Sequence, residues 1–357
     1  MSERVMARVV RIDAVEKHPN ADSLDICTVG GWRVVTKLGE YAAGDLAVFA
    51  EVDAWVPNEL APYLSKGKEP RVFNGVKGER LKTVRLRGEL SQGLLLPFTA
   101  TLADYAKDFD DEGQPFWMGP EDFFQEGQDV SEVLGIQKWE APIPAQLAGV
   151  MRGNFPVGIP RTDAERVQNL GTELQQWITD DIQFEVTIKL DGSSMTVTNI
   201  NQDVQVCSRN LSLKLDQEGN SFVDLAKSLG LIEKLSAYDR EIAIQGELIG
   251  PGIQRNQEQL TAHDFYVFEV YDIKAGKYLD SKSRRQICEE FALKHVPILY
   301  ESISLKELDI SCIDDALKFA EGSSLNPKAN REGVVFKNAD GSIKFKAISN
   351  SWLLRNE

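Results

Sequence analysis

The sequence lacks any apolar run of membrane-spanning length, and its first residues, MSERVMARVV, lack the continuous apolar stretch of a signal peptide. Cysteine is also scarce. The four cysteines are far apart and form no CxxC pair (Cys27, Cys207, Cys288 and Cys312). The sequence therefore implies neither a disulfide framework nor a zinc site, and we expect a cytoplasmic protein with no membrane partner.

The chain has enough residues for two domains. Its 357 residues can form two hydrophobic cores, and its contents of 42% hydrophobic and 27% charged residues are ordinary for a globular protein. No internal repeat or low-complexity tract is present. These features indicate a globular fold and exclude a fibrous or disordered chain.

The net charge of −15 at pH 7 disfavours a nucleic-acid partner, but the charge is unevenly distributed. Residues 66–87 include eight basic and two acidic residues, whereas residues 104–132 include ten acidic residues and one lysine. Two solvated faces of opposite sign would explain this pattern, and so would a basic surface that contacts phosphates. We predict that four residues of the basic segment contact nucleic acid, namely Arg80, Lys82, Arg85 and Arg87.

The N-terminal region, from about Met6 to Phe98, consists of short β-branched segments separated by turn residues. Five short strands in this pattern predict a small antiparallel barrel of the OB type. We expect the OB module to occupy residues 1–137, with an acidic, loop-like insertion near 101–127. An extended linker over 138–160 should follow, because that segment is apolar and has regularly spaced prolines.

Individual residues of the barrel have predicted roles. The segment HPNADSLDICTV resembles the OB modules of tRNA-binding proteins, so a transfer-RNA partner stays open. We expect its His18 to support a barrel turn, and Trp32 and Trp55 to lie in the barrel core.

The C-terminal region, 161–357, reads as an α+β domain with an extensive, mostly antiparallel sheet. RTDAERVQNLGTELQQWITD predicts a helix capped by Thr162 or Asp163. Alternating segments predict strands at 184–190, 194–199, 203–208, 241–248, 265–272, 333–337 and 342–347. Helices are expected near 220–235, 282–294 and 312–321.

One lysine stands at an unusual position. The segment FEVTIKLDGSSMTVT predicts a strand, a tight turn and a second strand, and Lys189 is the last residue of the first strand. An ammonium group at that position must reach water or be held by partners, because burying it unpaired is costly.

Similar polar or aromatic residues stand in, or at the ends of, the other apolar strands. They are Glu185, Lys189, Asp191, Arg209, Glu247, Phe268, Glu332, Lys344 and Lys346. Lys344 and Lys346 share one face of their strand by the two-residue period. Any one of these residues is most simply a surface charge, but the ordered set suits a polyanion and a divalent metal, since carboxylates hold metals and lysines neutralise phosphates.

The order of these motifs resembles the covalent nucleotidyltransferase superfamily of polynucleotide ligases and RNA capping enzymes. The resemblance rests on KLDG from Lys189, a strand-borne Glu247, the aromatic strand of Phe268, EGVV from Glu332, and KFK from Lys344, over residues 184–347. It implies an ATP-grasp-like adenylyltransferase domain. The N-terminal OB module, with no further OB segment after Lys346 in this sequence, is similar to the RNA ligases of the Deinococcus and Naegleria type.

The resemblance implies an ATP-dependent RNA ligase that seals 3′-OH/5′-phosphate breaks, as nicks in duplexes, through lysyl-AMP and an AMP-capped 5′-phosphate. The expected cofactors are ATP with Mg²⁺ or Mn²⁺, the expected partner is RNA-containing nucleic acid, and the expected state is a monomer.

The resemblance also assigns a role to each residue. Lys189 is the nucleophile, and Lys344 and Lys346 hold the α-phosphate. Asp191, Glu247 and Glu332 position the metal through water, or the ribose. Phe268 stacks on adenine, Arg209 contacts the adenylate or the 5′-phosphate, Glu185 belongs to the nucleotide-binding set, and Arg166, on the preceding helix, contacts phosphate.

A lysine attacks only when it is deprotonated, so the pKa of Lys189 must fall below its usual value of about 10.4. We expect desolvation beside Lys344 and Lys346 to lower it, and a metal ion to lower it further. An arginine would stay charged. Two alternatives stay open. One is a DNA ligase or capping guanylyltransferase, against which the missing C-terminal module counts. The other is a non-catalytic OB-type nucleic-acid-binding protein, against which the complete set of catalytic-type residues counts.

Overall fold

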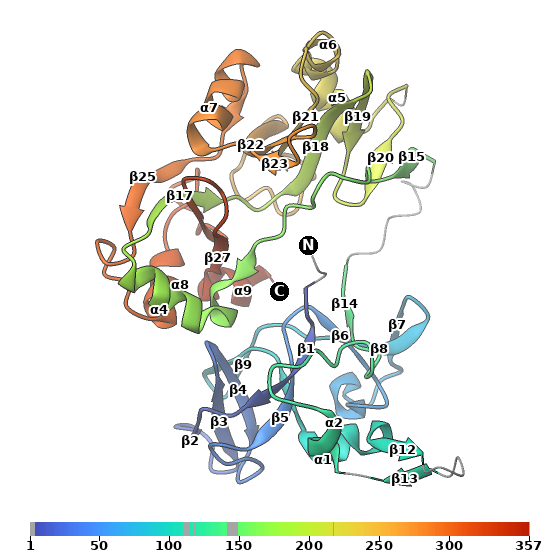
Figure 1. Ribbon diagram of the computed structural model, residues 1–357, viewed down its shortest axis with the longest axis vertical. Coiled ribbons are helices and arrows are strands. Elements are labelled where there is room, and N and C mark those ends of the chain that lie inside the picture. Colours follow the sequence, from blue (N-terminus) through green and yellow to red (C-terminus); the bar gives the residue numbers. More distant parts are fainter. Residues whose placement is uncertain (1–3, 110–114, 118, 141–148, 217, 357) are drawn as a thin grey trace. The chain divides into compact units, whose positions relative to one another are not determined.

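The structure is a computed structural model that describes residues 4–109, 115–117, 119–140, 149–216 and 218–356 (Figure 1). Parts of the predicted insertion (110–114 and 118) and of the predicted linker (141–148) lie outside the described residues. The chain divides into two compact units, Met1–Pro142 with Leu354–Glu357, and Ile143–Leu353. Among the described residues, no helix has the length and apolar character needed to cross a bilayer.

The first unit is built from short strands that form the predicted barrel of OB type. The strands are β1 (Ala7–Arg11), β2 (Ala14–Lys17), β3 (Leu24–Val29), β4 (Trp32–Lys37), β5 (Leu46–Ala50), β6 (Ala54–Pro57), β7 (Arg71–Phe73), β8 (Val76–Arg80), β9 (Val84–Leu86), β10 (Glu89–Ser91), β11 (Leu94–Pro97) and β14 (Gln137–Lys138), with a 3₁₀ turn, η1 (Pro62–Ser65). The main sheets have the orders β1-β5-β11, β2-β3-β4 and β14-β6-β8-β7. Trp32 and Trp55 are buried, which confirms their predicted place in the core.

The predicted loop at 101–127 is largely regular structure. It contains α1 (Phe98–Leu102), η2 (Ala103–Tyr105), β12 (Lys107–Phe109), β13 (Pro115–Trp117) and α2 (Pro120–Phe123). Leu102, Ala106 and Phe124 are buried in the same core as Val48 and Val130. The loop prediction was wrong because this acidic segment carries spaced apolar residues that complete the core of the first unit.

The second unit contains two sheets. The larger has the order β15-β20-β19-β18-β21-β22-β23, with β24 beside β22. Its strands are β15 (Met151–Asn154), β18 (Ser193–Ile200), β19 (Asp203–Cys207), β20 (Leu211–Leu213), β21 (Ile242–Ile249), β22 (Asp264–Asp272), β23 (Lys277–Tyr278) and β24 (Lys294–His295). One face is apolar and packs on α5 (Ser221–Ser228), α6 (Leu231–Ser236) and α7 (Ser281–Glu290) (Figure 1).

The smaller sheet has the order β16-β27-β26-β17-β25. Its strands are β16 (Glu165–Arg166), β17 (Gln183–Lys189), β25 (Ile298–Ser304), β26 (Gly333–Asn338) and β27 (Lys344–Ile348). Its apolar face packs on α4 (Gly171–Thr179) and α8 (Ile313–Ala320), and α9 (Asn350–Asn356) follows β27. All seven predicted strands are present within two residues of their predicted ends. The other strands of this unit (β15, β16, β20, β23, β24 and β25) and the division into two sheets were not predicted.

Two predicted helices differ from the structure. The helix expected from Thr162 begins only at Gly171, because residues 165–166 form β16 and residues 167–169 a 3₁₀ turn, η3 (Val167–Asn169). The helix expected over 220–235 is divided into α5 and α6 at Gly230, whose φ of 64° is left-handed. The first difference matters for function, because it places Arg166 on a strand of the smaller sheet.

Candidate active site

The polar residues of β17 lie on one face of the smaller sheet because strand side chains alternate. Phe184 and Val186 point into the apolar core, so Glu185 and Lys189 point to the opposite face. In the antiparallel ladders Lys189 lies opposite Gly333. A row of charged residues crosses the same face, from Glu185 to Lys337 on β26 and Lys344 on β27.

Lys189 is held at the end of β17 by the residue that precedes β26. Its Nζ donates to Glu332 Oε2 at 2.6 Å, and the lysine side chain keeps 27% of its exposure. Gly333, next to Glu332, permits this arrangement, since a Cβ there would lie 2.2 Å from the Ala347 carbonyl oxygen of β27. Gly333 therefore lets β26 and β27 approach each other closely. Because Gly333 lies opposite Lys189, the preceding residue Glu332 lies near the lysine.

The turn after β17 brings two further carboxylates to Lys189. Gly192 packs against β21: a Cβ there would lie 2.4 Å from the Leu248 carbonyl oxygen and 2.9 Å from Glu247 Cγ. Glu247 and Asp191 both interact electrostatically with Lys189. The predicted residues Lys189, Asp191, Glu247 and Glu332 are thus brought together.

The charges of this group shift its protonation equilibria. Burial, together with the charge of Glu332, raises the pKa of Asp191 to about 6. Burial raises the pKa of Glu247 to about 8. The charges of Glu332 and Asp191 act in the same direction, and the charge of Lys189 opposes them. The carboxylates repel one another, and this excess of negative charge favours a further cation.

The sequence-based expectation was that the pKa of Lys189 is lowered. With only the charges of the chain itself present, this expectation was wrong. Burial lowers this pKa, as expected, but the attraction of Glu332 and Glu247 outweighs burial, and the pKa is raised. Lys344, which we expected to lower it, is bound to another carboxylate. Lys189 therefore needs its neighbouring carboxylates neutralised before it can act as a nucleophile at neutral pH.

A divalent metal fits this group through water. The part of the chain that the structure describes has no cluster of three His, Cys, Asp or Glu side chains placed to ligate a metal directly. The three carboxylates, which repel one another, can instead accept hydrogen bonds from the water shell of a hydrated Mg²⁺. This ion keeps several of its waters in proteins. The prediction of a water-mediated metal site at Asp191, Glu247 and Glu332 stays a prediction.

Lys344 belongs to a second group, centred on Glu269 of β22. Glu269 Oε1 lies 3.0 Å from Lys337 Nζ and 3.4 Å from Lys344 Nζ, and Glu269 Oε2 lies 3.5 Å from Arg284 Nη1 of α7. Burial raises the pKa of Glu269, but the three cations outweigh it and the pKa is lowered. Burial lowers the pKa of Lys337 to about 8. Glu269 therefore joins the polar faces of the two sheets and holds Lys344.

Glu185 belongs to this second group rather than to the group around Lys189. Arg284 Nη2 donates to Glu185 Oε1, and Arg285 Nη1 donates to Glu185 Oε2 at 3.0 Å. The Glu185 side chain is only 1% exposed. Its carboxylate is occupied by two arginines of α7, and its predicted place in the nucleotide-binding set stays a prediction.

Three other predicted residues lie on the same sheets. Phe268 sits at a bulge of β22, half-buried against Ile188 and Leu190, and its carbonyl oxygen accepts from Lys337 Nζ at 2.5 Å. Arg166 is buried on β16, in register with Lys346 of the parallel strand β27. The structure thus puts Arg166 beside a predicted phosphate-binding lysine, although on a strand and not on a helix.

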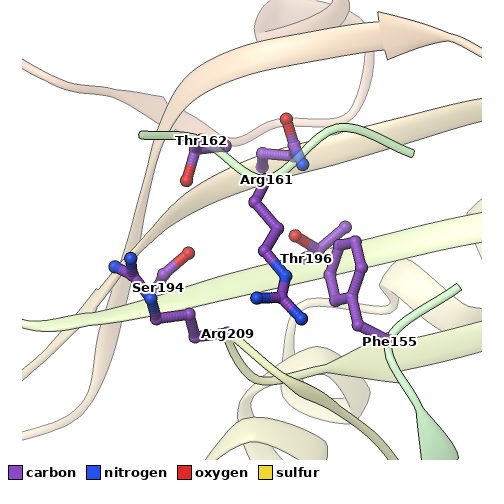
Figure 2. A pocket seen from close by; sticks show the side chains of 7 residues that line it. Phe155, Arg161, Thr162, Ser194, Thr196 and Arg209 are labelled. Atoms are coloured by element: carbon purple, nitrogen blue, oxygen red, sulfur yellow. The ribbon is translucent and has the colours of Figure 1, made fainter. Parts of the chain in front are cut away.

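Arg209 follows β19, on the larger sheet. Its Nη2 donates to Asp163 at 2.7 Å. It lines a pocket with Arg161, Ser194 and Thr196, and Figure 2 shows it beside Ser194. Since Ser194 lies opposite Glu247 in the ladder of β18 and β21, this pocket borders the carboxylates around Lys189.

The four predicted nucleic-acid contacts of the first unit have different environments. Arg80 donates to Asp53 at 2.6 Å and lies 4.1 Å from the ring centroid of Trp139. Its guanidinium is thus already paired within the chain, and its assignment as a phosphate contact stays a prediction. Lys82 is half-buried, whereas Arg85 and Arg87 are exposed on the hairpin of β9 and β10.

His18 supports this hairpin. Its Nε2 is 3.1 Å from the Leu86 carbonyl oxygen, and its Nδ1 accepts from Asn20 N at 3.1 Å. Asn20 Nδ2 in turn donates to the Arg87 carbonyl oxygen. The expectation that His18 supports a turn is confirmed.

Sequence reasoning missed Lys337, Glu269 and Arg284. A signal was present for the first two, because each is a charged residue inside an apolar strand, in GVVFKN and FYVFEVYD. Nothing in the local sequence of α7 distinguishes Arg284, which is only 2% exposed, from the neighbouring surface arginine.

The raised pKa of Glu247 leads to a testable result for stability. A carboxyl whose pKa rises from about 4.3 in the unfolded chain to about 8 in the folded chain costs stability as pH rises between these values. We expect Glu247→Gln, without metal, to raise the free energy of unfolding by about 1–3 kcal/mol at pH 8.5, with the difference shrinking as pH falls and vanishing only below about pH 4. Urea unfolding at both pH values measures the difference in stability. The control is Glu233→Gln, which changes an exposed glutamate. A Glu247→Gln variant that is less stable than the wild type at pH 8.5 would contradict the expectation.

Comparisons with known proteins agree with the family resemblance and with the OB fold. The sequence model of the RNA ligase family matches residues 182–352, and that of an OB-fold domain matches residues 6–98. The solved structure of Naegleria gruberi RNA ligase with pyrophosphate is 39% identical, with a TM-score of 0.83, and the match covers 98% of each chain. A variant of that ligase with AMP and Mn is also 39% identical over 98% of each chain, with a TM-score of 0.84.

A third relative shares only part of its length. The beta subunit of phenylalanine–tRNA ligase from Symbiobacterium thermophilum is 35% identical over 133 residues, which is 37% of this chain. The chain spans only 13% of the length of that subunit.

Proposed function

Because the chain belongs to the RNA ligase family, we propose that it uses ATP to join a 3′-OH end of RNA to a 5′-phosphate end, at nicks in duplexes and as a monomer. The observation that carries this proposal is Lys189 at the end of β17, bound to Glu332 at 2.6 Å, with Lys344 and Lys346 on β27, two strands away in the same sheet. A nucleophile beside carboxylates and cations suits phosphoryl transfer from ATP. Structures of the Naegleria relative with ATP and Mn support this donor.

In the first step Lys189 Nζ attacks the α-phosphorus of ATP, so that an N–P bond forms and pyrophosphate leaves. Lys344 and Lys346 offset the charge that develops on the α-phosphate. Phe268 stacks on adenine. Asp191, Glu247 and Glu332 would hold a hydrated Mg²⁺ or Mn²⁺, which when bound would supply positive charge to the phosphates.

In the later steps AMP passes from Lys189 to the 5′-phosphate of RNA, and the 3′-OH attacks that phosphate and releases AMP. Arg209, on the rim of the carboxylate group, contacts the incoming 5′-phosphate, and Arg166 contacts phosphate from β16. Both arginines suit this role because guanidinium groups bind phosphate oxygens bidentately.

The test uses nicked duplexes with RNA or DNA on the 3′-OH side, a divalent cation, and ATP or GTP. Sealing of the RNA nick with ATP alone is the expected result, and chelation of the metal should abolish it. Equal sealing of the DNA nick would move the assignment to a DNA ligase. A product capped with GMP would move it to a guanylyltransferase.

The exposed arginines of the hairpin give a separate prediction. We expect Arg85→Ala/Arg87→Ala to lower sealing about tenfold at 0.15 M salt and to reduce the salt slope by about two, because two phosphate contacts are lost. Formation of the lysyl-AMP adduct should not change.

The matched control is Arg71→Ala/Lys77→Ala, which removes two cations of the same unit that are paired with Glu79 and Glu69. If both double variants reduce sealing equally, the effect comes from net charge and the hairpin has no special role.

A further inference from the structure

A polar pocket lies on the larger sheet, on the face opposite its apolar core. Its lining residues are Phe155, Arg161, Thr162, Ser194, Thr196, Arg209 and Gln245 (Figure 2). Thr196 and Gln245 are direct neighbours in the ladder of β18 and β21. Gln245 lies two residues before Glu247, so the pocket is displaced by roughly 7 Å along β21 from the carboxylates around Lys189.

Gln245 presents an unsatisfied hydrogen-bond acceptor. The residue is fully buried, and its Nε2 donates to the Pro160 carbonyl oxygen at 3.0 Å. This bond fixes the orientation of the amide, because a carbonyl oxygen can only accept. Gln245 Oε1 is buried and has no hydrogen-bond partner among the described residues, a state that costs free energy until a donor binds.

Arg161 provides a cation beside this acceptor. Figure 2 shows its side chain extending toward Thr196 and Phe155. Within the described part of the chain no hydrogen bond or ion pair of Arg161 is found, whereas Arg209 on the other side of the pocket is bound to Asp163. The pocket thus combines a guanidinium without a carboxylate partner, hydroxyl groups and a buried acceptor that needs a donor.

We propose that this pocket binds one ribose-phosphate unit of the RNA strand, with a phosphate on Arg161 and a ribose hydroxyl donating to Gln245 Oε1. The proposal rests on the proposed function and adds to it a basis for choosing RNA. A hydroxyl beside a phosphate repeats at every nucleotide of RNA, and DNA lacks the 2′-OH that would serve as donor.

ATP also has ribose hydroxyls and phosphates, so the donor nucleotide is the other source of this chemistry. The RNA strand is favoured because Arg161 is exposed and Arg209 is 43% exposed. Two exposed arginines among the lining residues are accessible to a polymer.

The experiment separates the two steps of the reaction. Adduct formation is measured with ATP, 2′-dATP and 3′-dATP. Sealing is measured without ATP on pre-adenylylated nicks that are all-ribose or carry one 2′-deoxynucleotide at each of the two positions on either side of the nick. We expect one deoxy position to slow sealing by about 10- to 100-fold, with adduct formation unchanged.

Gln245→Leu tests the acceptor. It should seal the all-ribose nick as slowly as the wild type seals the sensitive deoxy nick, and it should no longer distinguish the two nicks. Retention of the full discrimination by this variant overturns the proposal, as does wild-type sealing that is insensitive to every deoxy position. If a deoxy-ATP slows adduct formation while no deoxy position slows sealing, the pocket binds ATP, and this result overturns the RNA assignment.

Arg161→Ala keeps the test decisive if Gln245→Leu does not fold, because Arg161 is exposed. It should slow sealing about tenfold on every nick and lower the salt dependence, and an unchanged rate overturns the phosphate contact. The control is Arg240→Ala, which removes another exposed arginine of the same unit, 43% exposed and paired with Asp272. The proposed function is tested separately: it requires that the wild type form the adduct with ATP and seal the all-ribose nick, whatever the pocket binds.

Discussion

Lys189→Ala should abolish the adduct: after incubation with ATP and a divalent cation, the intact mass of the variant stays unchanged, whereas the wild type gains one AMP. The expected loss is at least about a thousandfold in rate, because no other group supplies the nucleophile. Lys189→Arg should fail equally, since a guanidinium stays protonated. Intact-mass spectrometry of protein freed from bound AMP measures both.

The control for this experiment is Lys318→Ala, which removes an exposed lysine of α8 whose side chain is 78% exposed. It should form the adduct at the wild-type rate. An adduct on Lys189→Ala would show that the nucleophile is another residue and would sink the mechanism.

The pH dependence of adduct formation tests the environment of Lys189. Its pKa is raised because the attraction of Glu332 and Glu247 outweighs burial. The ammonium form is therefore favoured at neutral pH, and the rate should rise with pH and vanish when the metal is chelated. A rate that falls between pH 6 and 9 would contradict this account.

Glu269→Ala should lower the free energy of unfolding by about 3–5 kcal/mol, the usual cost of removing one partner of a buried ion pair. The change leaves Lys337, whose side chain is 5% exposed, and the buried Arg284 without the carboxylate between them. Urea unfolding of the second unit measures the loss. Lys344 should also lose its position, so adduct formation should fall even where the variant is folded.

The matched control is Glu301→Ala, since Glu301 is 74% exposed and lies 3.8 Å from Arg285. Its effect should stay below about 0.5 kcal/mol. The double variant Glu269→Leu/Lys337→Met should recover part of the lost stability. A loss below about 1 kcal/mol for Glu269→Ala would mean that water, and not Glu269, balances these cations.

The sequence predicted those residues of the candidate site that stand in recognisable motifs. The two-residue alternation of FEVTIK and the turn residues Asp191 and Gly192 are local signals, because strand and turn geometry depend on neighbours in the chain. They located Lys189 at the end of β17, and the family resemblance selected Glu247 and Glu332 as its partners.

Other assignments could not be made from the sequence, because they depend on which charges meet across the two sheets. Glu185 and Glu332 are both acidic residues of the smaller sheet, yet Glu185 is bound by two arginines of α7 and Glu332 binds the nucleophile. Arg80 belongs to a basic segment but pairs with Asp53, 27 residues away. A charge count cannot separate such residues.

Periodicity, turn residues and motif order are local signals, and they were enough to predict the barrel, seven strands of the second unit and the family. Three features could be seen only in the folded chain: the direction of the pKa shift of Lys189, the place of Glu269 between two lysines and an arginine, and the unsatisfied acceptor of Gln245. Protonation equilibria and buried hydrogen bonds depend on distance and burial, and these are set by contacts between residues far apart in the sequence.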